Sequence, residues 1–386
     1  MESAWIVAGR RTAFTRAGKG ALAGARPDDL LAALFRRLIA SLPEPALERL
    51  DEVVVGCAYP EAEQGRNAAR LIALNAGVPE RVPAMTLTRM CASSLEATAV
   101  ACSKVRLGEA SLVLVGGMES MTRIPIGGVK PSPNPALMEA KPEAYMAMGL
   151  TAERVAARYG VSRADQDAWA LRSHQRAGAA RARGVQDEEI LPVEAPAESG
   201  PACVSADDAL RPDSTLEKLA ALKPAFDEGG TVTAGNACPT SDGASALIVA
   251  SGAAVSELGL APLGRFVSYA VGGVSPAMMG IGPVTAVPVA LGRAGLGLRD
   301  LDRIELNEAF AAQVLAVVRE LELPEERVNV NGGAIALGHP LGATGARLVG
   351  TLLRELNRGG GRYGLATLCV GGGMGAAMVL EGAGRP

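Results

Sequence analysis

A glycine-rich stretch near the C-terminus carries one of only two histidines among the 386 residues. His339 stands within residues 329–347, together with five glycines and one proline. Glycine permits positive φ and close approach of other groups, whereas proline fixes φ. An imidazole in so constrained a turn is typical of a positioned catalytic group. A histidine that merely packs in a glycine-rich turn is the alternative.

Two cysteines stand where secondary-structure elements are expected to meet. Cys91 lies between a predicted strand at 82–87 and a predicted helix that ends near Leu107. The N–H groups and positive partial charge of a helix N-terminus favour a thiolate and lower its pKa, which makes Cys91 a candidate nucleophile. Its alternative is a small residue that only packs there. Cys369 ends a predicted strand at 362–370, and ligands bind at the carboxyl ends of strands in α/β sheets.

The elements that must position these residues alternate between strand and helix. Before residue 118, apolar patterning predicts strands at 5–9, 50–56, 82–87 and 111–117, and helices at 27–40, 66–76 and about 91–107. Residues 118–250 hold proline-rich turns and an amphipathic helix at about 164–183, and are too apolar for a linker. His174 on that helix is expected at a solvated position.

The α/β pattern resumes at residue 263 and repeats the first half of the chain. Residues 50–59 align with 301–310, and the strand at 111 aligns with the one at 364. Two similar halves that pack with converging strand ends would bring four side chains together, namely Cys91, Asn307, His339 and Cys369.

Composition excludes several classes of protein. Hydrophobic residues make up 48% and charged residues 20%, so the chain can bury a sizeable core. A net charge of -3 gives no reason to expect nucleic acid or an anionic membrane as partner. No apolar run is expected to span a bilayer, and the N-terminus lacks a signal-peptide layout, so we expect a cytoplasmic protein. Without C-x-x-C pairs we expect neither zinc nor a disulfide framework. Four further cysteines are expected to be small buried hydrophobes: Cys57, Cys102, Cys203 and Cys238.

Short motifs lie along nearly the whole chain: Arg-Met-Cys-Ala-Ser-Ser at 89–94, Gly-Gly-Met-Glu-Ser-Met at 116–121, Met-Gly-Leu-Thr-Ala-Glu at 148–153, Thr-Ala-Gly-Asn at 233–236, Ser-Asp-Gly-Ala at 241–244, Asn-Glu-Ala-Phe at 307–310, the glycine-rich run at 332–342 and Cys-Val-Gly-Gly-Gly at 369–373. In order and spacing these segments resemble the motifs of the thiolase family, and most of all those of the 3-ketoacyl-CoA thiolases of fatty-acid β-oxidation.

The resemblance implies a five-layered αβαβα fold with two similar βαβ-rich halves and an inserted loop domain. The N-terminal half would comprise residues 1–117 and about 241–260, the loop domain 118–240, and the C-terminal half 261–386. Thiolases are dimers or tetramers, so a homodimer or homotetramer is expected.

The resemblance also implies roles for matching residues. Cys91 would take the acyl group, His339 would accept its proton, and Cys369 would move a proton on and off the α-carbon. Asn307 would orient a water in one oxyanion hole, and the N–H groups of Cys91 and Gly371 would form the other.

Binding residues are implied in the same way. Ser268 would lie near the pantetheine arm, and Lys223 stands where arginine is frequent and would meet a phosphate. Met148 and Phe310 would line the acyl pocket. Ala147 replaces a histidine common in acetoacetyl-CoA-specific enzymes, which favours longer or varied chains.

The implied activity is reversible thiolytic cleavage of 3-ketoacyl-CoA through an acyl-cysteine, with coenzyme A as co-substrate and no permanently bound cofactor or metal. Alternatives are an acetoacetyl-CoA-specific biosynthetic thiolase, a condensing enzyme acting on a carrier protein, and a non-catalytic acyl-CoA-binding relative. A subunit that anchors other β-oxidation enzymes is a further alternative, compatible with activity.

Overall fold

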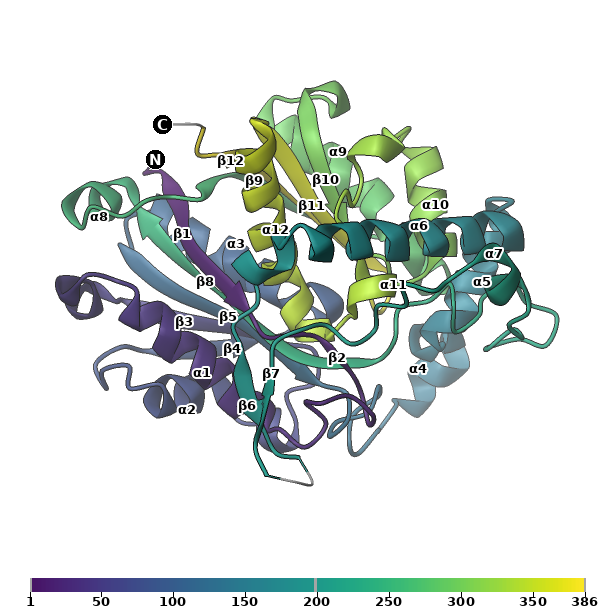
Figure 1. Ribbon diagram of the computed structural model, residues 1–386, viewed down its shortest axis with the longest axis horizontal. Helices are drawn as coiled ribbons and strands as arrows, with labels where there is room; N and C mark the ends of the chain where they lie inside the picture. The colour runs from purple at the N-terminus through teal and green to yellow at the C-terminus, as the bar shows by residue number, and fades with distance from the viewer. Residues whose placement is uncertain (1, 198–199, 385–386) are drawn as a thin grey trace.

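The computed structural model describes residues 2–197 and 200–384 (Figure 1). Its main sheet runs in the order β10-β11-β12-β9-β1-β8-β5-β3-β4, with β2 also paired to β8. The strands of this sheet are β1 Ala4–Arg11, β2 Thr15–Arg16, β3 Glu52–Cys57, β4 Ala84–Leu87, β5 Leu112–Ser120, β8 Ser241–Ser251, β9 Gly264–Gly273, β10 Leu301–Leu306, β11 Tyr363–Val370 and β12 Met374–Gly382.

The two ends of this sheet repeat one topology, as the sequence repeat predicts. In the first half β3 is parallel to β5, β5 is antiparallel to β8, and β8 is antiparallel to β1. In the second half β10, β11, β12 and β9 follow the same scheme. The halves meet where β1 pairs with β9 at only two positions. The strand β8 completes the first half although it follows the insertion in sequence.

Helices cover both faces of each half. The helices of the two halves are α1 Pro27–Ala40, α2 Ala68–Asn75, α3 Ser93–Arg106, α8 Gly252–Glu257, α9 Gly282–Ala294, α10 Ala311–Glu320, α11 Ala334–Leu337 and α12 Thr344–Gly359. One apolar core joins α1 and α2 to the first half, a second joins α9 and α10 to the second half, and a third surrounds α3 and α12 between them. Three cores between five layers confirm the predicted αβαβα architecture.

Local sequence explains why α1 matches its predicted bounds. Pro27 occupies the first helical position, and Asp28 and Asp29 follow in the first turn, where acids favour the helix dipole. Leucines and Phe35 recur at helical spacing and are buried against the sheet.

Glycines allow α3 and α12 to begin side by side. A Cβ on Gly345 would lie 2.2 Å from the backbone nitrogen of Leu95, and one on Gly56 would lie 2.2 Å from the carbonyl carbon of Ser93. The N–H of Ala346 donates to the Ser94 hydroxyl at 2.9 Å. The glycine-rich sequence is therefore required where two helix N-termini converge.

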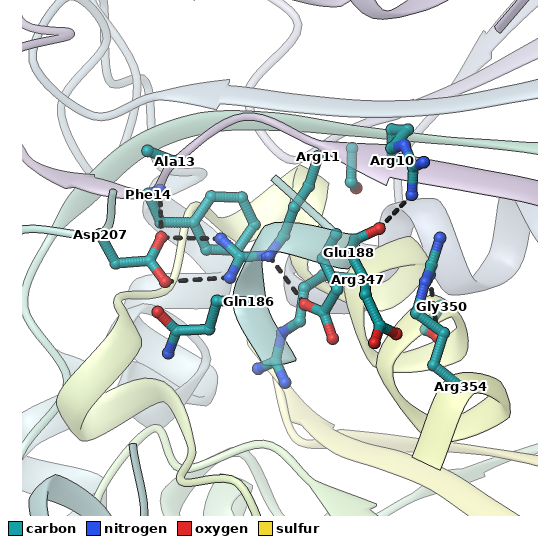
Figure 2. Close-up of polar contacts among 12 residues, drawn as sticks. Arg10, Arg11, Ala13, Phe14, Gln186, Glu188, Asp207, Arg347, Gly350 and Arg354 are labelled. Atoms are coloured by element: carbon teal, nitrogen blue, oxygen red, sulfur yellow. Dashed lines mark hydrogen bonds and ion pairs between the residues drawn. The ribbon is translucent and has the colours of Figure 1, made fainter. Parts of the chain in front are cut away.

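Most of the insertion between β5 and β8 packs at the end of the molecule where α5, α6 and α7 lie, whereas its β6–β7 hairpin lies beside α1 (Figure 1). The insertion contains α4 Pro135–Ala140, α5 Met148–Arg158, α6 Arg163–Ala182, α7 Leu216–Ala220 and the hairpin β6 Val193–Ala195 with β7 Ala202–Val204. The buried guanidinium of Arg11, at the end of β1, pairs with Glu189 at 3.1 Å and with Asp207 at 2.7 Å (Figure 2). This ion-pair network joins the insertion to the central sheet.

Three expectations from the sequence are wrong. His174 is only 5% exposed, because the segment at Arg211 covers it and donates its N–H to Nδ1 at 3.3 Å. Burial lowers the pKa of His174 to about 4. Cys203 is exposed, on the projecting β6–β7 hairpin.

The third wrong expectation is that no apolar stretch is long enough to span a bilayer. By length and composition alone Pro276–Ala294 is apolar enough to cross a membrane. Half of the stretch is buried inside the molecule, and its α9 portion packs on β9 and β12. It has the packing of a core helix.

Candidate active site

Cys91 lies in a short 3₁₀ turn, Met90–Ala92, between β4 and α3. Met90 adopts a φ of 45°, which is uncommon outside glycine. The Ser93 hydroxyl donates to the Met90 carbonyl at 2.6 Å and accepts the Arg89 N–H at 2.9 Å. The Thr88 hydroxyl accepts the Met90 N–H at 3.3 Å and so also holds the turn. Local hydrogen bonds thus hold a sparsely populated backbone conformation that presents Cys91.

The thiol of Cys91 is protonated in this resting structure. The N–H groups of Gly371 and Cys91 both interact with the sulfur and lower its pKa. Burial has the larger effect and raises the pKa of Cys91 to about 11, with the Glu119 carboxylate adding to the rise. The N–H groups at the start of α3 act in the expected direction, but desolvation outweighs them, so the pKa of this thiol is raised overall. Cys91 requires a base to become a nucleophile.

His339 is held by three hydrogen bonds, and they define its tautomer. Its backbone N–H donates to the Ser241 hydroxyl at 3.1 Å. Ring Nδ1 lies 2.6 Å from the Thr344 hydroxyl, whose own hydrogen is donated to the Pro340 carbonyl at 2.8 Å. The Thr344 oxygen must therefore accept, so Nδ1 carries the proton and Nε2 has the lone pair.

Nε2 of His339 lies 3.2 Å from Nδ2 of Asn307, which donates to it. Burial, with a further contribution from Arg347, lowers the pKa of His339 to about 3. The imidazole is consequently neutral, with its basic nitrogen on the Asn307 side. The turn that follows it, Leu341–Ala343, contacts the Cys91 turn.

Asn307 directly follows β10, and its N–H donates to the Thr367 carbonyl at 3.0 Å. Its side-chain oxygen is buried and has no hydrogen-bond partner among residues 2–197 and 200–384. A buried amide oxygen without a partner is costly unless a water or ligand group satisfies it. This orphaned acceptor beside His339 suits the predicted positioning of a water by Asn307.

Cys369 is the penultimate residue of β11 and pairs with Gly375 of β12. Burial raises the pKa of Cys369, and the neighbouring Cys91 and Cys238 raise it further. The glycines at 372 and 373 have φ values of 86° and 84°, so they form the sharp turn from β11 into β12. The predicted pair of thiols is therefore brought together.

A buried carboxylate, that of Glu308, holds the loop that leads to His339. Glu308 accepts hydrogen bonds from Trp169 at 3.0 Å, from Ser173 at 2.6 Å and from Asn329 at 3.0 Å. A Cβ on Gly333 would lie 2.2 Å from the Glu308 carboxyl carbon. The insertion helix α6, which carries Trp169 and Ser173, thus fixes the loop that leads to His339.

Glu119, at the end of β5, is a second buried carboxylate, and its hydrogen bonds hold the turn after His339. Its carboxylate accepts the N–H groups of Ala58 at 2.8 Å and Gly342 at 2.9 Å, and the amide of Gln64 at 2.7 Å. Burial raises its pKa, which these hydrogen bonds oppose. The end of β3 and the turn after His339 are thereby joined.

The predicted acyl-pocket residues lie on one apolar wall. The ring of Phe310 is 6.0 Å from that of Phe226 in an edge-to-face arrangement. Phe226 remains 43% exposed, and a Cβ on Gly149 would lie 2.1 Å from its ring. Met148 packs against the same core as Phe310. Sequence reasoning missed Phe226, although Lys223 three residues earlier was singled out.

Comparison with known proteins identifies the family. The sequence model "Thiolase, N-terminal domain" matches residues 4–253, and "Thiolase, C-terminal domain" matches residues 260–382. The chain belongs to the thiolase family. This thiolase is 50% identical to a 3-ketoacyl-CoA thiolase of Bacillus subtilis (strain 168), over 99% of this chain and 100% of that protein. It is 47% identical to a β-ketoadipyl-CoA thiolase of Pseudomonas putida, over 99% and 100% of the two chains.

Solved structures agree with this assignment. The human mitochondrial 3-ketoacyl-CoA thiolase superposes with a TM-score of 0.90 at 38% identity, covering 99% of each chain. The dimeric peroxisomal thiolase of Saccharomyces cerevisiae superposes with a TM-score of 0.92 at 37% identity, covering 99% of this chain and 97% of that one. The protein is an enzyme of the acyltransferase class.

Two predicted binding residues, Ser268 and Lys223, remain predicted coenzyme A contacts of this thiolase. Ser268 is buried, and its hydroxyl donates to the Ala290 carbonyl of α9 at 2.7 Å. Ser268 and Gly272 are four residues apart on β9, a separation of roughly 13 Å. Gly272 pairs with Gly375, which in turn pairs with Cys369. Lys223 is exposed, and no ion pair to it occurs in the described part of the chain.

Cys238 is a site residue that sequence reasoning assigned to packing. Its N–H donates to the Ala309 carbonyl at 3.0 Å, two residues from Asn307. Its charge interaction with Cys91 raises the already high pKa that burial gives it. The available signal was its place between two family-like segments, at 233–236 and 241–244. Within residues 2–197 and 200–384, no cluster of three histidine, cysteine or acidic side chains is arranged for a metal ion.

Proposed function

We propose that this thiolase cleaves 3-ketoacyl-CoA with coenzyme A, reversibly, to acetyl-CoA and a shortened acyl-CoA through an acyl-Cys91 intermediate. The observation that carries the proposal is the neutral His339, whose Nε2 lone pair is fixed by Thr344 and Asn307 next to the Cys91 turn. A protonated thiol and a neutral imidazole are suited to act together, the thiol as the nucleophile and the imidazole as the base that takes its proton.

In the first half-reaction, the Cys91 sulfur attacks the keto carbon while its proton passes to Nε2 of His339. The N–H groups of Cys91 and Gly371 stabilise the resulting oxyanion. The bond between the keto carbon and the α-carbon then breaks, and Cys369 protonates the departing α-carbon. His339 and a water held by Asn307 stabilise the enolate oxygen during this step.

In the second half-reaction, the Cys369 thiolate takes the proton of the coenzyme A thiol. The coenzyme A sulfur attacks the acyl-Cys91 carbonyl, releases the shortened acyl-CoA, and Cys91 recovers its proton from His339. Each group thereby returns to its starting state, and the kinetics are ping-pong.

The apolar wall of Met148, Phe226 and Phe310 supports uncharged acyl chains longer than four carbons, and so a role in fatty-acid β-oxidation. The Bacillus subtilis relative is named a 3-ketoacyl-CoA thiolase, which supports a 3-ketoacyl-CoA as the substrate class. Coenzyme A as co-substrate is supported by the human mitochondrial relative, whose structure has also been solved in complex with CoA.

A homo-oligomer, such as a dimer or tetramer, is supported by the dimeric yeast relative and by β4, whose outer edge is unpaired in the described chain. A cytoplasmic location is supported by six cysteines that are all free thiols.

Intact mass after mixing with acetyl-CoA, followed by peptide mapping, tests the mechanism. We expect an acetyl group on Cys91, none in Cys91→Ala, and acylation without α-proton exchange in Cys369→Ala. An adduct on Cys369, or equal acylation of both variants, would contradict the assigned roles. Turnover of 3-ketohexanoyl-CoA, acetoacetyl-CoA and 3-oxoadipyl-CoA tests the chain preference, and cleavage of only the latter two would overturn it.

A further inference from the structure

A cavity opens where the two halves of the sheet separate. Strands β1 and β9 pair only at Trp5–Arg265 and Ile6–Gly264, and the register of β1 shifts directly afterwards. Beyond this point a cavity of about 990 Å³ lies between β1 residues 7–10, the end of α1 and the last turns of α12. A bulge that redirects a strand next to a hollow is a recurrent feature of functional sites.

The cavity has a strong excess of positive charge. Its charged lining consists of Arg10, Arg37, Arg354 and Arg358 against a single acid, Glu188. Arg358 pairs with Glu188 at 2.9 Å. The other three arginines form no ion pair within residues 2–197 and 200–384. In a chain of net charge -3, this grouping is a local feature.

Arg354 is the arginine held most firmly. It is partly buried and donates to the backbone carbonyls of Gly350, at 3.1 Å, and Gly9. A Cβ on Gly9 would lie 2.7 Å from the Leu247 side chain of the neighbouring strand β8 and 3.8 Å from the Arg354 guanidinium, so glycine leaves room for both groups beside β1. Figure 2 shows Arg354 and Arg10 on the same side of β1 as Glu188.

The charge of Arg354 is only partly compensated. Burial lowers its pKa, and Arg10 adds to the lowering, whereas Glu189 and Glu188 oppose it. Carbonyl dipoles orient the guanidinium without neutralising it. An anion in the cavity would supply the missing countercharge.

We propose that this cavity binds a soluble phosphorylated small molecule of nucleotide size, whose oxyanions pair with Arg10, Arg37 and Arg354. Guanidinium groups match phosphate oxygens in geometry and charge. The volume falls in the range of small-molecule sites, and the apolar side chains of Val7, Leu38 and Leu263 offer contact to an organic portion.

This site is separate from the catalytic one. Arg354 stands ten residues after Thr344, at the start of α12, which corresponds to about 15 Å along the helix. The same helix therefore carries the His339 turn at one end and the arginines at the other. The proposal holds whichever 3-ketoacyl-CoA the enzyme prefers.

Isothermal titration calorimetry of the full-length enzyme tests the proposal, with inorganic pyrophosphate and ADP as probes and saturating desulfo-CoA filling the substrate site. We expect one site per chain, with ADP binding more tightly than pyrophosphate. Arg37→Gln and Arg354→Gln should each weaken binding at least tenfold. Arg37 is exposed and outside the core, so its variant remains folded and keeps basal turnover.

The matched control is Arg36→Gln, the preceding residue of α1, which donates to the Asn75 carbonyl at 2.8 Å and does not line the cavity. Its affinity for the probes should equal that of the unaltered enzyme. No binding by the unaltered enzyme, or equal weakening by Arg36→Gln and Arg37→Gln, would overturn the proposal. Binding to phosphatidylglycerol vesicles that Arg37→Gln abolishes, without ADP binding, would replace the soluble ligand by a lipid headgroup.

Discussion

Replacing Thr344 with valine tests the geometry of the proposed base. Valine keeps the shape of threonine but removes the oxygen that accepts the Nδ1 proton of His339. The proton can then move to Nε2, where the Asn307 amide can turn its orphaned oxygen to accept it. That tautomer has no lone pair facing the reaction, so the variant should lose activity while staying folded.

The size of the expected loss in kcat follows from the burial of the hydrogen bond between His339 and Thr344. An unpaired buried donor costs about 1–3 kcal/mol. If this penalty falls on the productive tautomer, kcat declines about 5- to 150-fold. The KM for coenzyme A should change far less, because Thr344 is buried behind the imidazole.

Thr98→Val is the matched control. Thr98 is also buried in a helix, and its hydroxyl also donates to a carbonyl four residues earlier, that of Ser94, at 2.8 Å. Its substitution removes the same helical bond without touching a histidine, so kcat should stay within about twofold of the unaltered enzyme.

Nitrogen-15 NMR reads the tautomers directly, because the chain has only two histidines. We expect His339 to be protonated on Nδ1, and His174 on Nε2 because its Nδ1 accepts the Arg211 N–H. Thr344→Val should change His339 alone. An unaltered kcat in Thr344→Val, or an Nε2-protonated His339 in the unaltered enzyme, would refute the reasoning.

Three further predictions concern other parts of the site. Because the pKa of Cys91 is raised to about 11, the rate of its alkylation by iodoacetamide should rise about tenfold per pH unit from pH 7 to 9. A rate that stays constant over this range would indicate a thiolate–imidazolium ion pair in the resting enzyme instead. Gly345→Ala should lower unfolding stability by about 1–3 kcal/mol through overpacking, whereas Gly178→Ala, with open space around it, should raise it by about 0.5–1 kcal/mol, as measured by urea denaturation. Gly149→Ala should displace the Phe226 ring and lower kcat/KM for 3-ketooctanoyl-CoA about tenfold relative to acetoacetyl-CoA, and an unchanged ratio would remove that wall from the pocket.

Local patterns carried much of the fold. The bounds of α1 agree because proline, acids and leucine spacing act within one helix. The glycine-rich stretch at 329–347 identified His339 because close packing and positive φ restrict the choice of residue. The repeat between 50–59 and 301–310 predicted two similar halves, and the sheet order bears this out.

Properties that depend on burial could not be predicted from the sequence. The start of α3 predicts a low pKa for Cys91, but the surrounding core desolvates the thiol and raises its pKa. His174 has the sequence environment of a surface residue, yet the segment around Arg211 covers it. Cys238 has no distinctive local pattern, and only the turn between the insertion and β8 places it beside the other thiols.

By itself, then, the sequence determined the family, the fold class and the identity of the paired thiols and histidine, because residue type and order encode these directly. The tertiary structure decided the protonation state of Cys91, the tautomer of His339, the contact of Phe226 with Phe310 and the arginine-lined cavity. Each of these depends on groups distant in sequence that meet only after folding, and the electrostatic energy of such groups is set by what surrounds them.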